Sequence, residues 1–178
     1  TPTASDLGFV IGPQLNAASR VDDSSLPSKL LISDDISEIE KISRKLILFN
    51  EKRKLIENNI FDEALIQVKK QATNKFIIVH GFGWHKGVLG IIASRLINQF
   101  YKPTIVISFD QTEGVGSARS INMIDLGSII LTAKKKGLLI NGGGHKMAAG
   151  LKIKKNLLDD FHTYLTQCFY KYDKYFDL

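Results

Sequence analysis

Apolar residues along positions 36–71 follow the spacing of an amphipathic helix. They recur three, four or seven residues apart, with Glu, Lys and Arg filling the gaps: Ile36, Ile39, Ile42, Leu46, Phe49, Ile56 and Ile60. Asp35, with Glu38 three residues on, resembles a capping box at the start of this helix. Unbroken, the helix would be about 55 Å long, which suits a rigid connector between two lobes. A break near Asn58 and Asn59 would instead give two ordinary core helices.

Two short apolar runs in the second half of the chain predict buried strands. The first is KFIIVHGF, residues 75–82, and the second is KPTIVISFD, residues 102–110. Between them, residues 85–101 place their apolar side chains on one helical face. A strand, a helix and a strand in this order predict a right-handed βαβ unit with a parallel strand pair.

The remaining segments complete a small α/β domain. We expect a loop at GVGSARS (114–120), a helix over about 124–136, a glycine loop, a strand at 150–155 and a helix over about 157–172. The predicted fold class is therefore α/β, with a small mixed sheet and flanking helices. Residues 1–33 are rich in turn formers and have no repeated period, so they predict loops and short elements. Their abrupt start suggests the tail of something larger.

The charge of the chain favours a polyanionic partner. The 178 residues include 24 Lys and Arg against 18 Asp and Glu, which gives a formal net charge of +6. Nucleic acid is the favoured partner, although many basic proteins carry such a charge without one. The hydrophobic fraction of 44% allows a real core and argues against global disorder.

The cysteine count and the apolar runs bear on the compartment. Cys168 is the single cysteine, so an intramolecular disulfide is excluded, and its spacing from Leu165 and Phe169 predicts a thiol in a helical core. No basic-then-apolar leader and no run of membrane-spanning length occurs. A reducing, cytoplasmic setting is the default expectation.

Two glycine-marked segments are candidates for anion binding. In GFGWHKGVLG, His85 and Gly87 lie between a strand and a helix amino terminus, where free N–H groups favour an anion. A simple turn would explain them equally well. In EGVGSARS, Ser117, Arg119 and Ser120 have the hydroxyls and the guanidinium to clamp a phosphate, although a loop arginine is more often merely solvated.

The segment NGGGHKMAAG, residues 141–150, gathers three glycines around a histidine. Gly142, Gly143 and Gly144 let the backbone approach a ligand closely, and His145 can donate to an anionic oxygen or act as an acid or base. The alternative is a glycine hinge beside a partly buried histidine.

No motif for a catalytic centre accompanies these segments. A two-metal site needs several Asp and His ligands, but the acidic pairs lie at turn or cap positions: Asp22 with Asp23, Asp34 with Asp35, and Asp159 with Asp160. HEXXH, Walker and GxSxG motifs are absent from the sequence. The sequence thus supplies parts for phosphate binding, and we assign no metal ligand.

Four motifs in order give the chain a family resemblance. GFVIGPQLNAASRVDDSSLPSKLLISDD, GWHKGVLGIIASRLI, GSARS and GGGHKMAAG resemble the carboxy-terminal part of the RecJ family of single-strand-specific exonucleases, within the DHH phosphoesterase superfamily. The resemblance runs from about Leu7 to at least Ile153. It implies that residues 1–35 are the end of a metal-binding DHH lobe with an α/β fold, residues 36–72 a connector helix, and residues 73–178 a DHH-associated, substrate-binding lobe.

The resemblance also implies roles for the glycine-rich motifs. His145, the candidate catalytic residue, and its glycines would hold the scissile phosphate opposite the metals. Ser117, Arg119 and Ser120 match the segment that binds the terminal 5′ phosphate or the DNA backbone. The GWH turn is expected to be partly structural.

The first motif implies a further basic position. Arg20, with Asn16 nearby, matches a residue that faces the same phosphate pocket in the family. The sequence departs from the family pattern at three positions: Ser19 and Ala118 replace common glycines, and Gln14 stands where a basic residue is frequent. Gln14 thus removes a cation from the contacts that the resemblance implies for the 5′ end.

The implied function is that of a fragment of a 5′-to-3′ single-stranded-DNA exonuclease in DNA repair and recombination. It would contribute phosphate binding and part of the active-site cleft, while the Mn or Mg ions of the intact enzyme would be held by the amino-terminal lobe and none by this chain. We expect the chain to be inactive alone. Expected partners are single-stranded DNA with a 5′ phosphate, a single-strand-binding protein and a helicase, with no membrane.

Two alternatives remain open at the level of sequence. The chain could belong to a superfamily phosphodiesterase or phosphatase that acts on short oligonucleotides or nucleotides. It could also be a non-catalytic nucleic-acid-binding module, related to the similar lobe appended to alanyl-tRNA synthetases.

Overall fold

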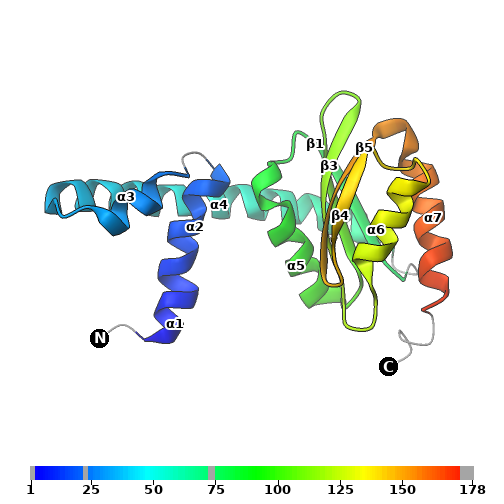
Figure 1. Ribbon diagram of the computed structural model, residues 1–178, viewed down its shortest axis with the longest axis horizontal. Coiled ribbons are helices and arrows are strands. Elements are labelled where there is room, and N and C mark those ends of the chain that lie inside the picture. Colours follow the sequence, from blue (N-terminus) through cyan, green and yellow to red (C-terminus); the bar gives the residue numbers. More distant parts are fainter. Residues whose placement is uncertain (1–2, 22–23, 72–74, 173–178) are drawn as a thin grey trace. The chain divides into compact units, whose positions relative to one another are not determined.

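The computed structural model describes residues 3–21, 24–71 and 75–172 (Figure 1). The chain divides into two compact units, Thr1–Asn59 and Ile60–Leu178. Each unit has its own packing and is described by itself. The helix α4, Ile36–Lys69, contributes residues to both.

The first unit begins with short helices, so the predicted short elements are confirmed, while most of the predicted loop is helical. It contains α1 (Ala4–Asp6), a π-helical turn (Leu7–Ile11), α2 (Gly12–Val21), α3 (Leu26–Ile32) and the first part of α4. Turn-forming residues here begin helices. Pro27, for example, lies in the first turn of α3, where its missing N–H leaves no hydrogen bond unmade. Ala18, Leu26, Ile42 and Leu46 form a small buried cluster that holds these helices together.

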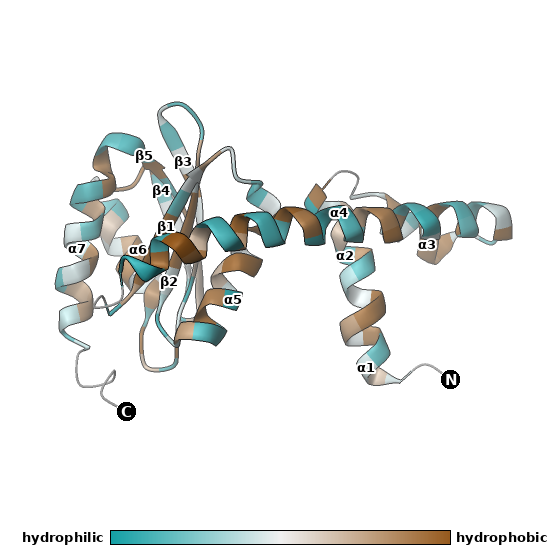
Figure 2. Ribbon diagram, turned by 180° about the vertical axis from the view of Figure 1, so that it is seen from behind, coloured by the Kyte–Doolittle hydropathy of each residue, from teal (hydrophilic) through white to brown (hydrophobic). Residues whose placement is uncertain are grey.

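The long helix was predicted correctly and has no break at Asn58 or Asn59. Figure 2 shows apolar and polar bands alternating around α4, as its periodicity required. The Asp35 carboxylate accepts the Ser37 N–H at 2.9 Å, but the Glu38 carboxylate accepts the Ser33 hydroxyl at 2.6 Å. Asp35 therefore caps the helix as expected, while the reciprocal half of the capping box is replaced by a bond to Ser33.

The second unit is built on a five-stranded mixed sheet with strand order β1-β2-β3-β5-β4. Its strands are β1 (Ile77–Phe82), β2 (Thr104–Phe109), β3 (Glu113–Arg119), β4 (Asn141–His145) and β5 (Ala148–Lys154). The pair β1 and β2 is parallel, and the other pairs are antiparallel. A short 3-10 turn (Lys86–Val88) and α5 (Leu89–Phe100) connect β1 to β2, which confirms the predicted βαβ unit and the mixed α/β class.

Two segments expected to be loops are strands. GVGSARS lies mostly in β3, and the glycine segment forms the β4–β5 hairpin. In β3 the buried positions alternate with half-buried ones, but the buried ones are small residues. A Cβ at Gly114 would lie 2.6 Å from the Phe109 ring, and one at Gly116 would lie 3.0 Å from Leu151. The alternation of buried and half-buried positions expected of a strand is therefore present. Its buried positions are small residues, which a hydropathy pattern does not identify as core.

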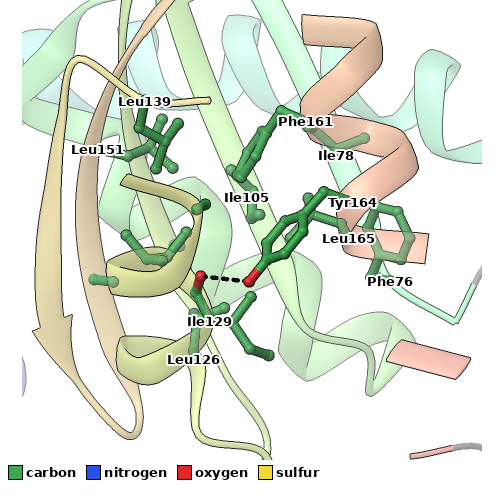
Figure 3. Close-up of a cluster of buried hydrophobic side chains, with 14 of the residues drawn as sticks. Phe76, Ile78, Ile105, Leu126, Ile129, Leu139, Leu151, Phe161, Tyr164 and Leu165 are labelled. Atoms are coloured by element: carbon green, nitrogen blue, oxygen red, sulfur yellow. Dashed lines mark hydrogen bonds between the residues drawn. The ribbon is translucent and has the colours of Figure 1, made fainter. Parts of the chain in front are cut away.

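Helices cover the two faces of the sheet unequally. The helices α6 (Leu126–Lys135) and α7 (Leu158–Tyr170) lie on one face, and α5 lies on the other, against β2 and β3 (Figure 1). Figure 3 shows the core between the sheet, α6 and α7, where the buried Tyr164 hydroxyl donates to the Ile129 carbonyl at 3.1 Å. Cys168 packs against the edge of this core and is partly buried.

Candidate functional site

Strand register brings the predicted binding residues onto one face of the sheet. Ile105, Ile107 and Phe109 of β2 belong to the core with α6 and α7, and their register partners on β3 are Ala118, Gly116 and Gly114. Since side chains alternate along a strand, the intervening residues of β3, β5 and β4 point to the opposite face. We call this part of the second unit the open face.

The open face consists of three rows that cross β3, β5 and β4. The first row is Arg119, Ala148 and His145; the second is Ser117, Gly150 and Gly143; the third is Val115, Lys152 and Asn141. Strand spacing places Arg119 and His145 roughly 10 Å apart at their Cα atoms, with only a methyl group between them. Successive rows are about 7 Å apart along the strands.

The guanidinium of Arg119 fits beside α5 because Gly90, in the first turn of that helix, has no side chain. A Cβ built on Gly90 would lie 2.7 Å from Arg119 Nη2 and 3.7 Å from Ser117 Oγ. The Arg119 Nη1 donates to the Ala118 carbonyl at 2.9 Å, which anchors one edge of the guanidinium. Gly90 therefore shapes the site. Sequence reasoning missed it, although a glycine inside an apolar helical pattern is a signal worth following.

His145 ends β4 and is exposed. Its Nδ1 accepts the Met147 N–H at 3.4 Å, so the neutral imidazole would carry its proton on Nε2 and could donate it to a ligand. The Met147 carbonyl accepts the Ser120 N–H at 2.9 Å, and the Lys146 carbonyl accepts the Leu126 N–H at 3.2 Å. The tip of the hairpin is thus fixed to the segment that precedes α6.

The helix α6 begins directly against the backbone of His145. A Cβ on Gly127 would lie 3.0 Å from the His145 carbonyl oxygen. Asp125 caps the helix by accepting the Ser128 N–H at 3.0 Å and the Ser128 hydroxyl at 2.8 Å. These two hydrogen bonds hold the pKa of Asp125 below its ordinary value, so the cap is ionised at neutral pH.

The three glycines of the GGG motif have different surroundings. Gly143 faces the open side, whereas a Cβ on Gly142 would lie 2.8 Å from the Ile130 side chain. A Cβ on Gly144 would overlap the Ala148 carbonyl oxygen. Gly142 and Gly144 are therefore glycines because of packing within the domain, and only Gly143 belongs to the open face.

Two other predicted binding residues make hydrogen bonds within the fold. Ser120 is buried, and its hydroxyl donates to the Ile124 carbonyl at 3.0 Å, so it secures a turn. His85 caps the short 3-10 turn, since its Nδ1 accepts the Gly87 N–H at 3.2 Å. Their part in binding a ligand stays a prediction.

The GWH turn has a structural role, as expected. The buried Trp84 donates from its indole to Glu63 Oε2 at 2.8 Å, and its carbonyl accepts the Ser108 hydroxyl at 2.6 Å. A Cβ on Gly81 would overlap the indole ring. This glycine and tryptophan thus join the end of β1 to α4 and β2.

Asn16 and Arg20 lie in the first unit, four residues apart on one face of α2. Asn16 is exposed, and its carbonyl accepts the Ser19 hydroxyl at 3.0 Å. Their role toward the open face stays a prediction.

The described part of the chain contains neither a cluster of metal ligands nor a membrane-spanning helix. Within residues 3–21, 24–71 and 75–172, no three His, Cys, Asp or Glu side chains gather to hold a metal ion. The donor set of the open face is one imidazole, one hydroxyl, one amide and cations, with the Glu113 carboxylate paired to Lys152 beside it, which does not fit a pair of divalent ions. None of the described helices is both long enough and apolar enough to cross a membrane.

The second unit is thus a mixed α/β domain that has Arg119 and His145 in one row of its sheet. Residues 73–171 match the family model described as the DHHA1 domain. The chain belongs to the DHHA1 domain family.

Relatives of known name support the resemblance to RecJ. The chain is 37% identical over 175 residues to "Single-stranded-DNA-specific exonuclease RecJ" of Haemophilus influenzae, a match that covers 93% of this chain and 30% of that protein. It is 34% identical over 164 residues to the protein of the same name in Bacillus subtilis, covering 90% of this chain and 21% of that protein. The chain therefore spans less than a third of the length of these relatives.

Solved structures agree with this relationship. RecJ from Thermus thermophilus in complex with Mn²⁺ matches with a TM-score of 0.82 at 30% identity, over 94% of this chain and 24% of that one. RecJ from the same organism in complex with Mg²⁺ matches with a TM-score of 0.81 at 29% identity, over 94% of this chain and 26% of that one. The resemblance predicted from the four motifs is confirmed.

Proposed function

We propose that this chain is the phosphate-gripping part of a RecJ-like exonuclease that removes nucleotides from single-stranded DNA in the 5′-to-3′ direction. The observation that supports it most strongly is the first row, in which register alone places Arg119 and His145 on either side of Ala148 on the open face. The names of the relatives, single-stranded-DNA-specific exonucleases, point to the same substrate class.

The chemistry of the first row suits a phosphodiester. A phosphate above Ala148 would accept from the Arg119 guanidinium on one side and from the His145 Nε2 proton on the other. Ser117, one row away, adds a hydroxyl donor next to Gly90. These groups fix the orientation of the phosphate and stabilise the charge that develops on its oxygens.

The hydrolytic step would require groups beyond this chain. RecJ structures contain Mn²⁺ or Mg²⁺, and such ions generate the attacking hydroxide and bind the leaving oxygen. In the proposal they are held by the part of the intact protein that this chain does not cover. The intact enzyme would act in cytoplasmic DNA repair and recombination, beside a helicase and a single-strand-binding protein.

The test is binding of the 178-residue chain to short single-stranded DNA, measured by fluorescence anisotropy at one fixed salt concentration. We expect 5′-phosphorylated DNA to bind more tightly than 5′-hydroxyl DNA, duplex DNA and structured RNA. Arg119→Ala should weaken the phosphorylated complex about tenfold to a hundredfold. The matched control is Arg44→Ala, which removes an exposed guanidinium from α4 and should change binding little.

Other outcomes would favour the alternatives. A preference for very short oligonucleotides would indicate a superfamily phosphodiesterase, and tighter binding of structured RNA would indicate a non-catalytic module. Equal binding of all competitors, with Arg119→Ala no worse than Arg44→Ala, would overturn the proposal.

A further inference from the structure

Two glycines face each other at the centre of the open face. Gly143 of β4 and Gly150 of β5 are register partners in the second row. Glycine inside a strand costs about 0.5–1 kcal/mol relative to alanine. It usually marks a bulge, a bend or the close approach of another group.

The fold itself requires neither glycine. Among the described residues the glycines with positive φ are Gly83, Gly137 and Gly144, so neither member of the pair is in the left-handed region. A Cβ on Gly143 would meet no atom within 4 Å, and one on Gly150 would meet only the Gly116 carbonyl oxygen at 4.0 Å. Both positions would therefore accept alanine without strain.

The missing side chains leave a hollow of about 510 Å³ above the pair. It is lined by Val115, Asn141, Gly142, Gly143, Gly150, Leu151 and Lys152. Its floor is peptide backbone, and its wall is the third row. The hollow begins about 7 Å from the first row, one step along the strands.

The wall of the hollow offers hydrogen-bond donors. The Asn141 Oδ1 already accepts from Lys134 Nζ at 2.8 Å and from the Gly142 N–H at 2.9 Å, which leaves its NH₂ group for a ligand. Lys152 Nζ pairs with Glu113 Oε2 at 2.5 Å, and both side chains are only partly exposed. A ligand held here must be flat enough to lie on backbone and must carry acceptors.

We propose that this hollow binds the base of the nucleotide adjoining the phosphate held by Arg119 and His145. This inference rests on the proposed function, which supplies that phosphate. A planar base fits a floor without side chains, and base carbonyl oxygens match the donors of Asn141 and Lys152. A second backbone phosphate would satisfy the same donors, but it has no need of a flat floor.

The first experiment tests the glycines without any ligand. Gly143→Ala and Gly150→Ala should leave the melting temperature of the chain unchanged or slightly higher. Alanine lowers the conformational entropy of the unfolded chain, and its Cβ would clash with no atom of the folded chain. Gly144→Ala is the contrasting variant, and it should lower the melting temperature because its Cβ overlaps Ala148. If the Gly143 and Gly150 variants lost as much stability as Gly144→Ala, these glycines would be required for folding, which would contradict the inference.

The second experiment uses 5′-phosphorylated single strands in which one nucleotide at a time is replaced by an abasic analogue. For the wild-type chain, we expect one position near the 5′ end at which loss of the base weakens binding about fivefold to tenfold. In Gly150→Ala the intact strand should bind as weakly as that abasic strand, and the positional effect should vanish. Lys152→Gln should weaken the intact strand, whereas the control Lys171→Gln, at the end of α7, should not.

The outcomes separate this inference from the proposed function. If Arg119→Ala abolished the preference for the 5′ phosphate while the abasic profile of Gly150→Ala equalled that of wild type, the hollow would not bind a base but the proposed function would stand. If no abasic position mattered and Lys152→Gln still weakened binding, the hollow would hold a phosphate, which contradicts the inference. If wild type showed no 5′-phosphate preference, both would fail.

Discussion

At the scale of single residues, the site depends as much on absent side chains as on present ones. Arg119 and His145 provide the charge and the proton, but Gly90 gives Arg119 its room and Ala148 keeps the space between the two open. Glycines that look alike in sequence therefore serve different purposes. A Cβ at Gly142 would contact the Ile130 side chain, whereas a Cβ at Gly143 would contact no atom within 4 Å.

Gly90→Ala should separate stability from binding. Alanine is favoured over glycine in a helix by about 1 kcal/mol, so the melting temperature of the chain should not fall. The new Cβ would lie 2.7 Å from Arg119 Nη2 and should displace that flexible side chain, weakening binding of 5′-phosphorylated DNA severalfold. Gln99→Ala, an exposed change on the same helix, is the control. Unchanged affinity in Gly90→Ala would show that Arg119 does not need this position.

His80 should make the stability of the chain depend on pH. Partial desolvation lowers the pKa of His80 from 6.5, the charge of Lys155 lowers it further, and Asp159 partly offsets them. The unfolded chain therefore binds this proton more readily, and stability should decline as pH falls below about 6.5 toward the lower folded pKa. Melting temperatures across that range should fall less steeply for His80→Gln. Parallel curves for the two proteins would mean that other groups cause the decline.

At the scale of elements, two glutamines at the end of the long helix bind the edge of the sheet. Gln67 Nε2 donates to the His80 carbonyl at 2.7 Å while its Oε1 accepts the His80 N–H at 3.0 Å. Gln71, just past the end of α4, makes the same pair of bonds to Ile78, at 2.7 Å and 3.2 Å. The two carboxamides thus satisfy backbone groups along the edge strand β1, which would otherwise be available for pairing with another chain.

Removing Gln71 should weaken this edge. Gln71→Ala leaves the N–H and carbonyl of Ile78 without their partner in a partly buried place, and we expect a loss of about 1–3 kcal/mol in the free energy of unfolding. Gln67→Ala, at a more exposed position, should cost less. Urea denaturation would measure both, with exposed Lys69→Ala at the end of α4 as the control. Equal stability of all three variants would contradict a structural role for the pair.

The elements also show what the sequence could predict. The long helix and the βαβ unit follow from local periodicity, because aliphatic side chains mark the buried face of each helical turn and each strand. The strands β3 and β4 were missed, whereas most of β5 was expected as a strand. In β3, Gly114, Gly116 and Ala118 carry the buried face with almost no side chain. The sequence proposed Arg119 and His145 as candidates, but it could not show that they share a row, because that depends on register across three strands.

At the scale of the whole molecule, the chain has a candidate phosphate site but no set of ligands for catalytic metals among its described residues. Its relatives are more than three times its length. We therefore expect the purified chain, supplied with Mn²⁺ or Mg²⁺, to release no nucleotides from single-stranded DNA. Metal-dependent release that co-purifies with the chain and disappears in Arg119→Ala would contradict this expectation.

We propose that the open face of β3, β5 and β4 holds the phosphate of single-stranded DNA. The most direct test is to titrate 5′-phosphorylated single-stranded DNA into isotopically labelled chain and to map the backbone amide shifts by NMR. We predict the largest shifts at Arg119, Gly143, His145 and Gly150, with little change along α7. Shifts confined to the lysines at the end of α6, with the first row unaffected, would contradict the account and leave only the general attraction of a basic protein for DNA.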